Sequence, residues 1–494
     1  MNKKLSLRGG YLLIQALVFG TIGLILIGAL ASWGAVNLRS SRSFAAREQA
    51  FHIAEAGIEY YRWHLAHAPT DYKDGQSGNG PYVHTYKDKD GAAIGTFTLT
   101  ITPPSVGSTI VTVLSEGRVT SDPTVVRRIE SRLAIPSIAK YAFVANSDMR
   151  FGEGTIVYGP IHSNQGVRFD GLAYNVVSSA KAEYDDPDHT GANEFGVHTH
   201  VTLPSGNVVD SFRASEAPPT NPVPVRTDVF VAGREFPLPA VDFNGFTSDL
   251  ATIKSQAQAS GRYFANSGRQ GYRVQFLTND TFRLYRVNTL RSAPNGCSNT
   301  QNQAGWGTWS IATAGNAQTL LGTYNIPANG LIFLEDNVWV DGQINTARVT
   351  VASARFPENP STYTNITVNE DLKYTNYDGR DVISLIAQND VNVGLYSDTD
   401  LQIDAALVAK NGRVGRYYYP GPNYSGNRCS PYHVRNSLTL FGMIGTNERY
   451  GFAYTDGNGY DDRVITYDGN LLYGPPPSFP LTSDHYETIS WREL

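Results

Sequence analysis

The residues best suited to chemistry lie in one acidic and histidine-rich stretch, YDDPDHTGANEFGVHTH, at residues 184–200. Its histidines and aspartates are His189, His198, His200, Asp185, Asp186 and Asp188. Imidazole and carboxylate together bind zinc, and the H-x-H spacing puts two rings on one face of a strand. The stretch has no cysteine and no helical HExxH pattern, so we favour a solvated polar loop over a zinc site.

A second group of candidate ligands lies near the C-terminus, in the run DGNGYDD at residues 456–462. Its oxygen-bearing side chains are those of Asp456, Asn458, Asp461 and Asp462. Oxygen ligands on a glycine-rich loop suit calcium, but the full EF-hand pattern is absent. Asp and Asn also serve turns structurally, since they tolerate left-handed backbone. We expect no cofactor and keep calcium at this loop as an alternative.

Groups that could perform catalysis are sparse. His162 and Ser163 are adjacent, and neighbours on a strand point to opposite faces, so they cannot act together as base and nucleophile. Asp398 and Asp400 would share a face, as the carboxylates of a polysaccharide lyase or hydrolase require, but surface aspartates are usually only solvated. The sequence contains no GxSxG, Walker A or GxGxxG motif. We predict that the chain is not an enzyme.

The two cysteines, Cys297 and Cys429, both lie in turn-like stretches. We predict a disulfide between them, because thiols oxidise outside the cytosol, and two free thiols are the alternative. The neighbouring tract Tyr417–Tyr419 is consistent with an exposed contact surface or with the packed edge of a core. The sequence does not decide between these two.

Composition indicates the compartment. The 494 residues carry 17% charged side chains, 47 glycines and 29 tyrosines, which is typical of an extracellular β protein. The formal net charge is only −5, so nothing favours nucleic acid as a partner.

The N-terminus predicts a long helix at residues 11–67 that crosses a membrane in its first half. No charged side chain occurs from Tyr11 to Val36, and roughly 20 apolar residues suffice to span a bilayer. A cleaved secretory signal has a shorter apolar region. The helical pattern continues through residues 39–67, where Phe51, Ala54, Ile58 and Trp63 fall close to one face.

Two segments of this region carry a resemblance. The start, KKLSLRGG-YLLIQALV, resembles the leader of type IV pilins, and AFHIAEAGIEYYRW resembles the AEAG segment of PilX-type minor pilins. The resemblance implies a basic leader at residues 1–10, cleaved between Gly10 and Tyr11. It also implies partners, either other pilin subunits or an assembly platform. Pilins usually carry Glu at the fifth mature position, which here is Gln15. An amide cannot neutralise a buried ammonium, so Gln15 favours a low-copy tip or priming subunit over a polymer-forming one.

Strand patterns follow the helix. We predict a mainly β fold with a small pilin-like β domain at residues 68–137 and a β-rich head whose first part is 138–204. Residues 205–330 read as an insertion with a linker, a helix and strands. Residues 331–494 read as a β-solenoid-like head and a C-terminal tail, because short strands alternate with Asn, Asp and Gly turns. An irregular β-sandwich is the alternative.

Three functions remain open. The first is a minor subunit of a type IV pilus or related envelope filament, presenting a head for assembly or adhesion. The second is a surface adhesin anchored by a single helix, and the third is an envelope polysaccharide lyase or hydrolase. The first two place the chain in the cell membrane as a single-pass protein with its head extracellular or periplasmic, and the first adds the pilus tip. The sequence does not identify a surface ligand.

Overall fold

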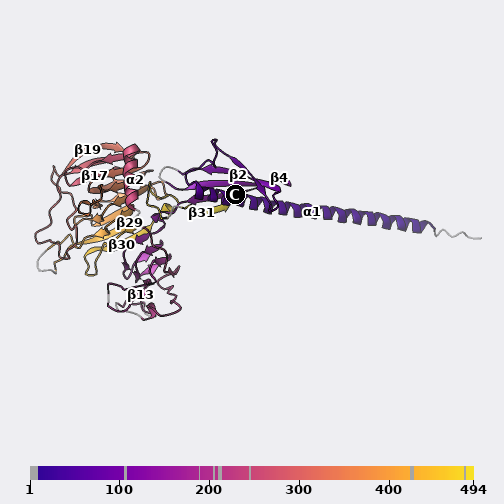
Figure 1. Cartoon of the computed structure of the whole chain (residues 1–494). Helices are drawn as coiled ribbons and strands as arrows, with labels where there is room; N and C mark the ends of the chain where they lie inside the picture. The colour runs from indigo at the N-terminus through magenta and orange to yellow at the C-terminus, as the bar shows by residue number, and fades with distance from the viewer. Residues whose placement is uncertain are drawn as a thin grey trace, which may run out of the picture. The chain divides into compact units, whose positions relative to one another are not determined.

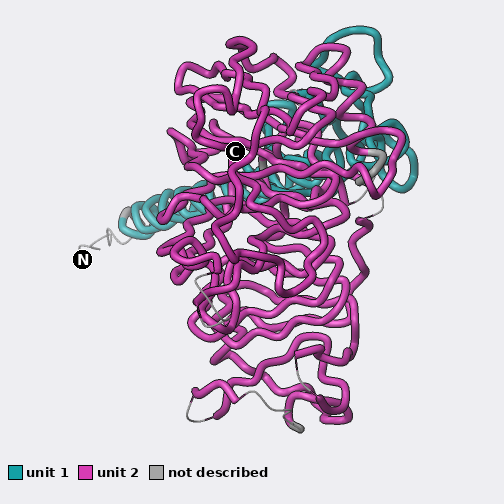
Figure 2. The backbone as a smooth tube through the Cα atoms, turned by 90° about the vertical axis from the view of Figure 1, so that its left-hand side faces the viewer, with its two compact units in different colours: residues 1–103, 111–134, 486–494 teal, residues 104–110, 135–485 magenta. Residues whose placement is uncertain are grey.

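A computed structural model describes residues 9–104, 108–188, 190–203, 206–209, 214–243, 246–422, 428–482 and 485–494. The chain forms two compact units, coloured separately in Figure 2. Unit 1 contains residues 1–103, 111–134 and 486–494, and unit 2 contains residues 104–110 and 135–485. The fold is mainly β with one long N-terminal helix.

Helix α1 runs without interruption from Gly9 to His67, as predicted for residues 11–67 (Figure 1). It contains no proline, and it ends two residues before Pro69, which cannot continue a helix without losing a backbone hydrogen bond. By length and composition it is the one helix among the described residues that could cross a membrane.

Unit 1 also contains a five-stranded antiparallel sheet. Its strands, in spatial order, are β1 (Tyr82–Lys87), β2 (Ala93–Thr102), β3 (Val111–Val119), β4 (Asp122–Ala134) and β31 (Glu487–Glu493). Buried and partly exposed residues alternate along β3, as expected of a sheet with one face on a core. The sequence assigned residues 331–494 entirely to the head and tail, and this was wrong for β31. The last strand of the chain pairs with β4, with Glu487 opposite Ala134.

The second half of α1 packs on this sheet. Its buried residues recur every three or four positions, at Ala46, Ala50, Ile53, Ala54, Ile58, Tyr61 and Leu65. Ala54 and Ile58 lie on this face as predicted, but Trp63 is 59% exposed and lies off it. Two glycines allow the close approach. A Cβ on Gly57 would lie 2.3 Å from Ser115 Oγ, and one on Gly117 would lie 2.0 Å from the Ala50 carbonyl oxygen.

Unit 2 is built from short strands. The first set is β5 (Phe143–Ala145), β6 (Met149–Phe151), β7 (Ile156–Val157), β8 (Ile161–Ser163), β9 (Val167–Phe169), β10 (Leu172–Ala173), β11 (Val177–Ser179), β12 (Glu183–Tyr184), β13 (Glu194–Phe195), β14 (Val197–His198) and β15 (Arg234–Glu235). The second set is β16 (Arg262–Phe264), β17 (Gly271–Leu277), β18 (Thr281–Val287), β19 (Gln318–Asn325), β20 (Leu331–Leu334), β21 (Val338–Gln343), β22 (Arg348–Ser353), β23 (Ile366–Thr367), β24 (Leu372–Lys373), β25 (Val382–Ala387), β26 (Val391–Val393), β27 (Asp400–Ala409), β28 (Val414–Arg416), β29 (Val434–Thr446) and β30 (Gly459–Tyr467). Helices α2 (Phe246–Ser260) and α3 (Asn470–Tyr473) accompany them, with 3-10 turns at Ile138–Lys140, Ala214–Glu216 and Pro360–Thr362.

Most of these strands pair in parallel with a strand one layer away, and Figure 2 shows the layers of unit 2 running alongside one another. One row of parallel pairs follows the order β16, β20, β22, β25, β27, β29, β5, β8, β11 and β15. The chain order differs from this spatial order. The first strand of the row in chain order is β5, from which successive strands follow one direction along the row to β15. The next strand, β16, lies at the opposite end, and the later strands follow the row back to β29. The β29–β5 pair therefore joins the last strand of the second series to the first strand of the first, with Ile444 opposite Phe143.

The predicted boundaries of an insertion at residues 205–330 do not hold throughout. Strands β16 and β17 pair in parallel with β20 and β21, so the chain from residue 262 onward belongs to the same stack. The helix expected in this region is α2. Strands were also expected in this region, and β17, β18 and β19 are present, whereas residues 307–313 contribute only an isolated bridge between Ile311 and Leu290.

The central strands are buried on both faces, which explains their continuous apolar runs. One side chain set of β22 and β25, including Val349, Val351, Ile383 and Leu385, belongs to the large interior core. The alternate set, including Ala352, Val382 and Ile386, packs with Leu250 and Ile253 of α2 and with Phe479. Helix α2 therefore covers the outer face of these strands.

Candidate functional site

The first half of α1 exposes a continuous series of large apolar side chains. Its large apolar side chains from Tyr11 to Phe44 are mostly 60–70% exposed. Thr21 donates its hydroxyl hydrogen to the Leu17 carbonyl oxygen at 2.6 Å, so its polar group is satisfied within the helix. Gln15 is also exposed, and its amide bonds to no other described side chain or backbone group. This segment suits an apolar environment outside the chain, with one unsatisfied amide near its start.

The proposed cleavage point, Gly10–Tyr11, lies in the first turn of α1. Residues 1–8 of the leader lie outside the described residues. Cleavage therefore stays a prediction.

A buried polar cluster lies at one edge of unit 2. Strands β6, β9 and β14 form a small parallel sheet, in which Arg150, Arg168 and His198 occupy paired positions across the three strands. Residues opposite one another in neighbouring strands point to the same face. The sheet thus brings two guanidinium groups and one imidazole into a row.

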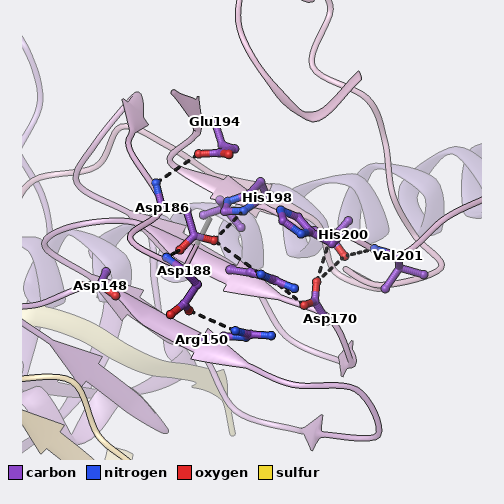
Figure 3. A network of polar contacts seen from close by, with 12 residues as sticks. Asp148, Arg150, Asp170, Asp186, Asp188, Glu194, His198, His200 and Val201 are labelled. Atoms are coloured by element: carbon purple, nitrogen blue, oxygen red, sulfur yellow. Dashed lines mark hydrogen bonds and ion pairs between the residues drawn. The ribbon is translucent and has the colours of Figure 1, made fainter. Parts of the chain in front are cut away.

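Asp186 joins this row from the loop after β12, and His200 joins it from the residues after β14 (Figure 3). The ligand atoms of Asp186, His198 and His200 all lie within 4.8 Å of one another. His198 Nε2 is 3.5 Å from an Asp186 carboxylate oxygen, and the two imidazole rings are 5.2 Å apart. Both histidines are fully buried and Asp186 is 2% exposed.

Burial of these three side chains shows that the predicted solvated loop was wrong for them. Asp185 is exposed, as that interpretation required, and Asp188 is partly buried. His189 lies outside the described residues. The H-x-H pair thus faces the interior rather than the solvent.

Two residues of the cluster were missed from the sequence, Arg168 and Asp170. The fully buried Arg168 donates from Nε to Asp170 at 2.7 Å, and the other oxygen of Asp170 accepts the His200 amide at 2.8 Å. Asp170 directly follows β9, two residues after Arg168, and this spacing was the available signal, because residues two apart in extended chain share a face.

Electrostatics favour the ionised form of Asp186. Burial opposes its ionisation, but the His198 ring, the Asp188 amide and Arg168 together hold the pKa of Asp186 below its ordinary value. Asp186 Oδ1 accepts the Asp188 amide at 3.0 Å, and Glu194 accepts the Asp186 amide at 3.2 Å. The carboxylate is therefore oriented by the backbone around it.

The candidate calcium loop is arranged differently. Asp456 accepts hydrogen bonds from the Tyr418 hydroxyl at 2.6 Å and from the Asn458 side chain and amide. Asp461 and Asp462 are exposed neighbours on β30 and so point to opposite faces. The four side chains are not gathered around one point, and Asp456 serves as a turn acceptor.

The two cysteine sulfurs are bonded to each other, and their Cα atoms are 4.6 Å apart. Cys429 is buried beside Leu395, Tyr417 and Tyr419. The three tyrosines Tyr417–Tyr419 are at most 3% exposed. They therefore form the packed edge of a core, and the interpretation as an exposed contact surface was wrong. Burial raises the pKa of the Tyr417 hydroxyl, which donates to Asp390 at 2.7 Å.

The remaining catalytic candidates have structural partners. His162 Nδ1 lies 2.9 Å from Ser178 Oγ, while the Ser163 hydroxyl donates to the Ser147 carbonyl oxygen. Asp400 accepts from Ser437 Oγ at 2.6 Å and from Asn436. His162 and Ser163 thus have separate partners, and Ser178 donates its own hydroxyl hydrogen to the Ile161 carbonyl oxygen at 2.9 Å.

No protein family and no curated protein matches the sequence. Among solved structures, the crystal structure of the competence-associated pilin ComZ from Thermus thermophilus is matched over 91% of this chain and 97% of its own. Sequence identity is 13% and the TM-score is 0.32. Function must therefore be argued from the residues of this chain.

Proposed function

We propose that the chain is a pilin-like minor subunit of a type IV pilus or related envelope filament. Its α1 would hold it in the membrane and against other subunits, and unit 2 would be its extracellular or periplasmic head. The observation that carries this proposal is the division of α1 into two halves of opposite character. The first half exposes apolar side chains on every face, and the second half is docked on the sheet through a single face.

This division distinguishes α1 from a helix of a soluble protein. A helix that is apolar all round must be buried in lipid or in other helices. In α1 that surface extends from Tyr11 to Val36, which is long enough to span a hydrocarbon core.

The AEAG segment gains a physical role in this arrangement. Ala54 is buried in the docked face, and Gly57 lies where a side chain would overlap Ser115 on β3. Small residues at these two positions let α1 approach the sheet closely. The same segment is the one that resembles PilX-type minor pilins, and this is why we place the chain near that class.

For unit 2 we propose a β-solenoid (a parallel β-helix) rather than a sandwich. The parallel row from β20 to β29 supports this, because sandwiches are built from antiparallel sheets. Asparagines stacked between layers support it too. Asn389 donates its side-chain amide to Asn365 at 3.0 Å, and Asn337 accepts the Asn365 backbone amide at 3.0 Å.

Gln15 supports a low-copy role at a tip or in priming. An ammonium at Tyr11 of a subunit above would find no charge partner in this side chain. We expect Gln15→Glu to leave the location of the protein unchanged and to produce no homopolymer. Homopolymer formation by this variant would show that residue 15 alone had prevented polymerisation.

The proposal is tested first by the intact mass of protein extracted from membranes. Cleavage predicts a mature chain that begins at Tyr11, and Gly10→Leu should retain the leader. A wild-type mass that still includes Met1 in cells with a working pilus system would contradict processing.

A helix exchange then separates a filament subunit from a plain membrane anchor. Residues 11–36 are replaced by an unrelated apolar helix of equal length, and pilus number and surface exposure of the head are scored. Loss of pili with the head still exported supports the filament subunit, because partner packing needs specific small residues such as Gly23 and Gly28. Full function after the exchange would make an anchored adhesin the better account.

A further inference from the structure

We propose that Asp186, His198 and His200 bind a divalent transition metal ion, of which zinc is the representative, and that this ion is structural. The three side chains offer two imidazole nitrogens and one carboxylate oxygen from a loop and a strand end that are twelve or more residues apart. Two histidines with one carboxylate are an established ligand set for such metals.

The spacing of the ligand atoms fits an ion that draws them together. Bonds of about 2.0–2.1 Å in a tetrahedral site place neighbouring ligand atoms about 3.3 Å apart. His198 Nε2 and Asp186 Oδ2 are already 3.5 Å apart, and all three ligand atoms lie within 4.8 Å. Binding would draw the His200 ligand atom closer to this pair.

His198 is the independent observation that points to a ligand. Its ring is fully buried, yet neither ring nitrogen has a hydrogen-bond partner within the described residues. Buried polar atoms are normally satisfied, because an unpaired buried donor or acceptor loses its hydrogen bonds to water without replacement. A metal ion bonded to Nε2 would satisfy the nitrogen that faces Asp186.

Charge in the cluster also favours a cation. The buried carboxylates of Asp170, Asp186 and Glu194 carry three formal negative charges, and the buried Arg168 supplies one positive charge. Arg168 directs its Nε to Asp170, and its nearest approach to Asp186 is 3.9 Å. A divalent ion bound by Asp186 and the two imidazoles would lie among these carboxylates. Imidazole ligands favour zinc-like ions over calcium, which binds oxygen.

The surroundings would orient the ligands as metal sites require. The Asp188 amide holds one oxygen of Asp186, and Asp170 holds the backbone at His200. Such outer hydrogen bonds fix ligand direction, and their loss typically weakens metal binding by about 10- to 100-fold. Because all three ligands are buried, the ion would tie the loop after β12 to β14 rather than meet a substrate.

The experiment uses the full chain in detergent, purified without a polyhistidine tag, stripped with EDTA and dialysed. Zinc and cobalt are titrated separately, with calcium as the oxygen-seeking comparison. We expect about one zinc per chain at micromolar concentration, d–d bands of four-coordinate cobalt, a rise in Tm of at least about 3 °C with zinc, and no such rise with calcium. Absence of zinc uptake by the wild-type chain would overturn the proposal and leave imidazolium–carboxylate pairs as the account of the cluster.

Variants assign the ligands. His198→Gln, His200→Gln and Asp186→Asn should each lower zinc affinity by more than about 10-fold. The matched control is His52→Gln, whose side chain is exposed on α1, and it should bind as the wild type does. Unchanged binding in the three folded ligand variants would overturn the assignment.

A second measurement tests the metal site even if the ligand variants fail to fold. X-ray absorption of the zinc-loaded wild-type chain should show two imidazoles and oxygen ligands without sulfur. A spectrum with sulfur, or with no imidazole, would contradict the site in the wild-type protein itself.

Discussion

Gly117 of β3 lies against Ala50 of α1 so closely that a Cβ on the glycine would stand 2.0 Å from the Ala50 carbonyl oxygen. The second closest atom, the Ala54 amide nitrogen, would be 2.5 Å away. Both are backbone atoms of a helix, which cannot shift locally without breaking its hydrogen bonds. The sheet and the helix therefore fit together only while residue 117 lacks a side chain.

Gly117→Val should accordingly destabilise unit 1. Overpacking of a closed core costs about 1–3 kcal/mol, and here backbone atoms are the obstacle, so the upper part of that range is expected. Thermal unfolding and limited proteolysis of unit 1 measure the loss. Gly78→Ala is the control, because nothing lies within 4 Å of a Cβ at that position. Equal stability of both variants would show that α1 is not seated on β3 in this way.

Removal of residues 486–494 should expose the edge of β4. Strand β31 contributes backbone pairing, the Arg492–Glu130 ion pair at 2.8 Å and the contact of Trp491 with Phe51. An uncovered edge strand pairs readily with other chains, so we expect faster proteolysis of unit 1 and concentration-dependent aggregation. Leu494→Ala serves as the control. A truncated chain that stays monomeric with wild-type stability would contradict this role for β31.

The bond between Cys297 and Cys429 should be complete in the protein purified from its native cells. Alkylation without reduction should label no thiol, and mass spectrometry reads the result. The loop spans 132 residues, so its closure contributes roughly 5 kcal/mol in the chain-entropy model. The double variant Cys297→Ser with Cys429→Ser should therefore unfold at a lower temperature, whereas labelling of two thiols in the wild type would rule the bond out.

Unit 2 should lose stability in mild acid because of His162. Burial lowers the pKa of His162 to about 4, with Asn164 opposing and the charge of Lys140 adding to the effect. The Ser178 hydroxyl donates to Ile161, so it accepts from His162 Nδ1, and Nε2 has no hydrogen-bond partner among the described residues. A second proton on the ring would therefore be a buried donor without an acceptor.

The sign of the effect follows from proton counts. Between pH 6.5 and 4 the unfolded chain binds a proton at this ring and the folded chain does not, so the free energy of unfolding falls as the pH falls. The full shift corresponds to on the order of 3 kcal/mol. Urea midpoints at pH 4.5, 6 and 8 should show a steeper decline for the wild type than for His162→Gln. Parallel pH profiles would remove His162 as the cause.

Much of unit 1 could be predicted from the sequence because its signals are local. The uncharged run from Tyr11 to Val36 and the helical pattern after it defined α1 almost to the residue. The orientation of its docked face was only half predicted, since Trp63 is apolar yet lies off the sheet. Strand β31 was missed because its partner β4 is more than 350 residues away, and no local pattern reports such a pairing.

The polar cluster shows a different limit. Residue types and the H-x-H spacing were visible, but burial was not, because the loop at residues 184–194 is rich in charged and turn-forming residues. What buries His198 is the parallel pairing of β14 with β9, and a two-residue strand leaves almost no trace in a sequence. The order of the strands in unit 2 could not be predicted either. The chain begins unit 2 with β5, in the middle of the row of parallel strands, and the sequence pattern would be the same if it began at one end.

The main segment of unit 2, residues 135–485, begins after Ala134 and ends before Tyr486. Ala134 and Glu487 lie opposite each other in the pairing of β4 with β31. Within unit 2 the two ends of the chain are also adjacent, since the Thr482 amide donates to the Pro136 carbonyl oxygen at 2.9 Å. Residues 135–485 are therefore inserted between two antiparallel neighbouring strands, where a short turn would otherwise connect them. A tight turn in place of residues 135–485 would leave the register of β4 and β31 unchanged. Insertion at such a point would let one inserted domain be exchanged for another while the helix and sheet of unit 1 keep their pairing.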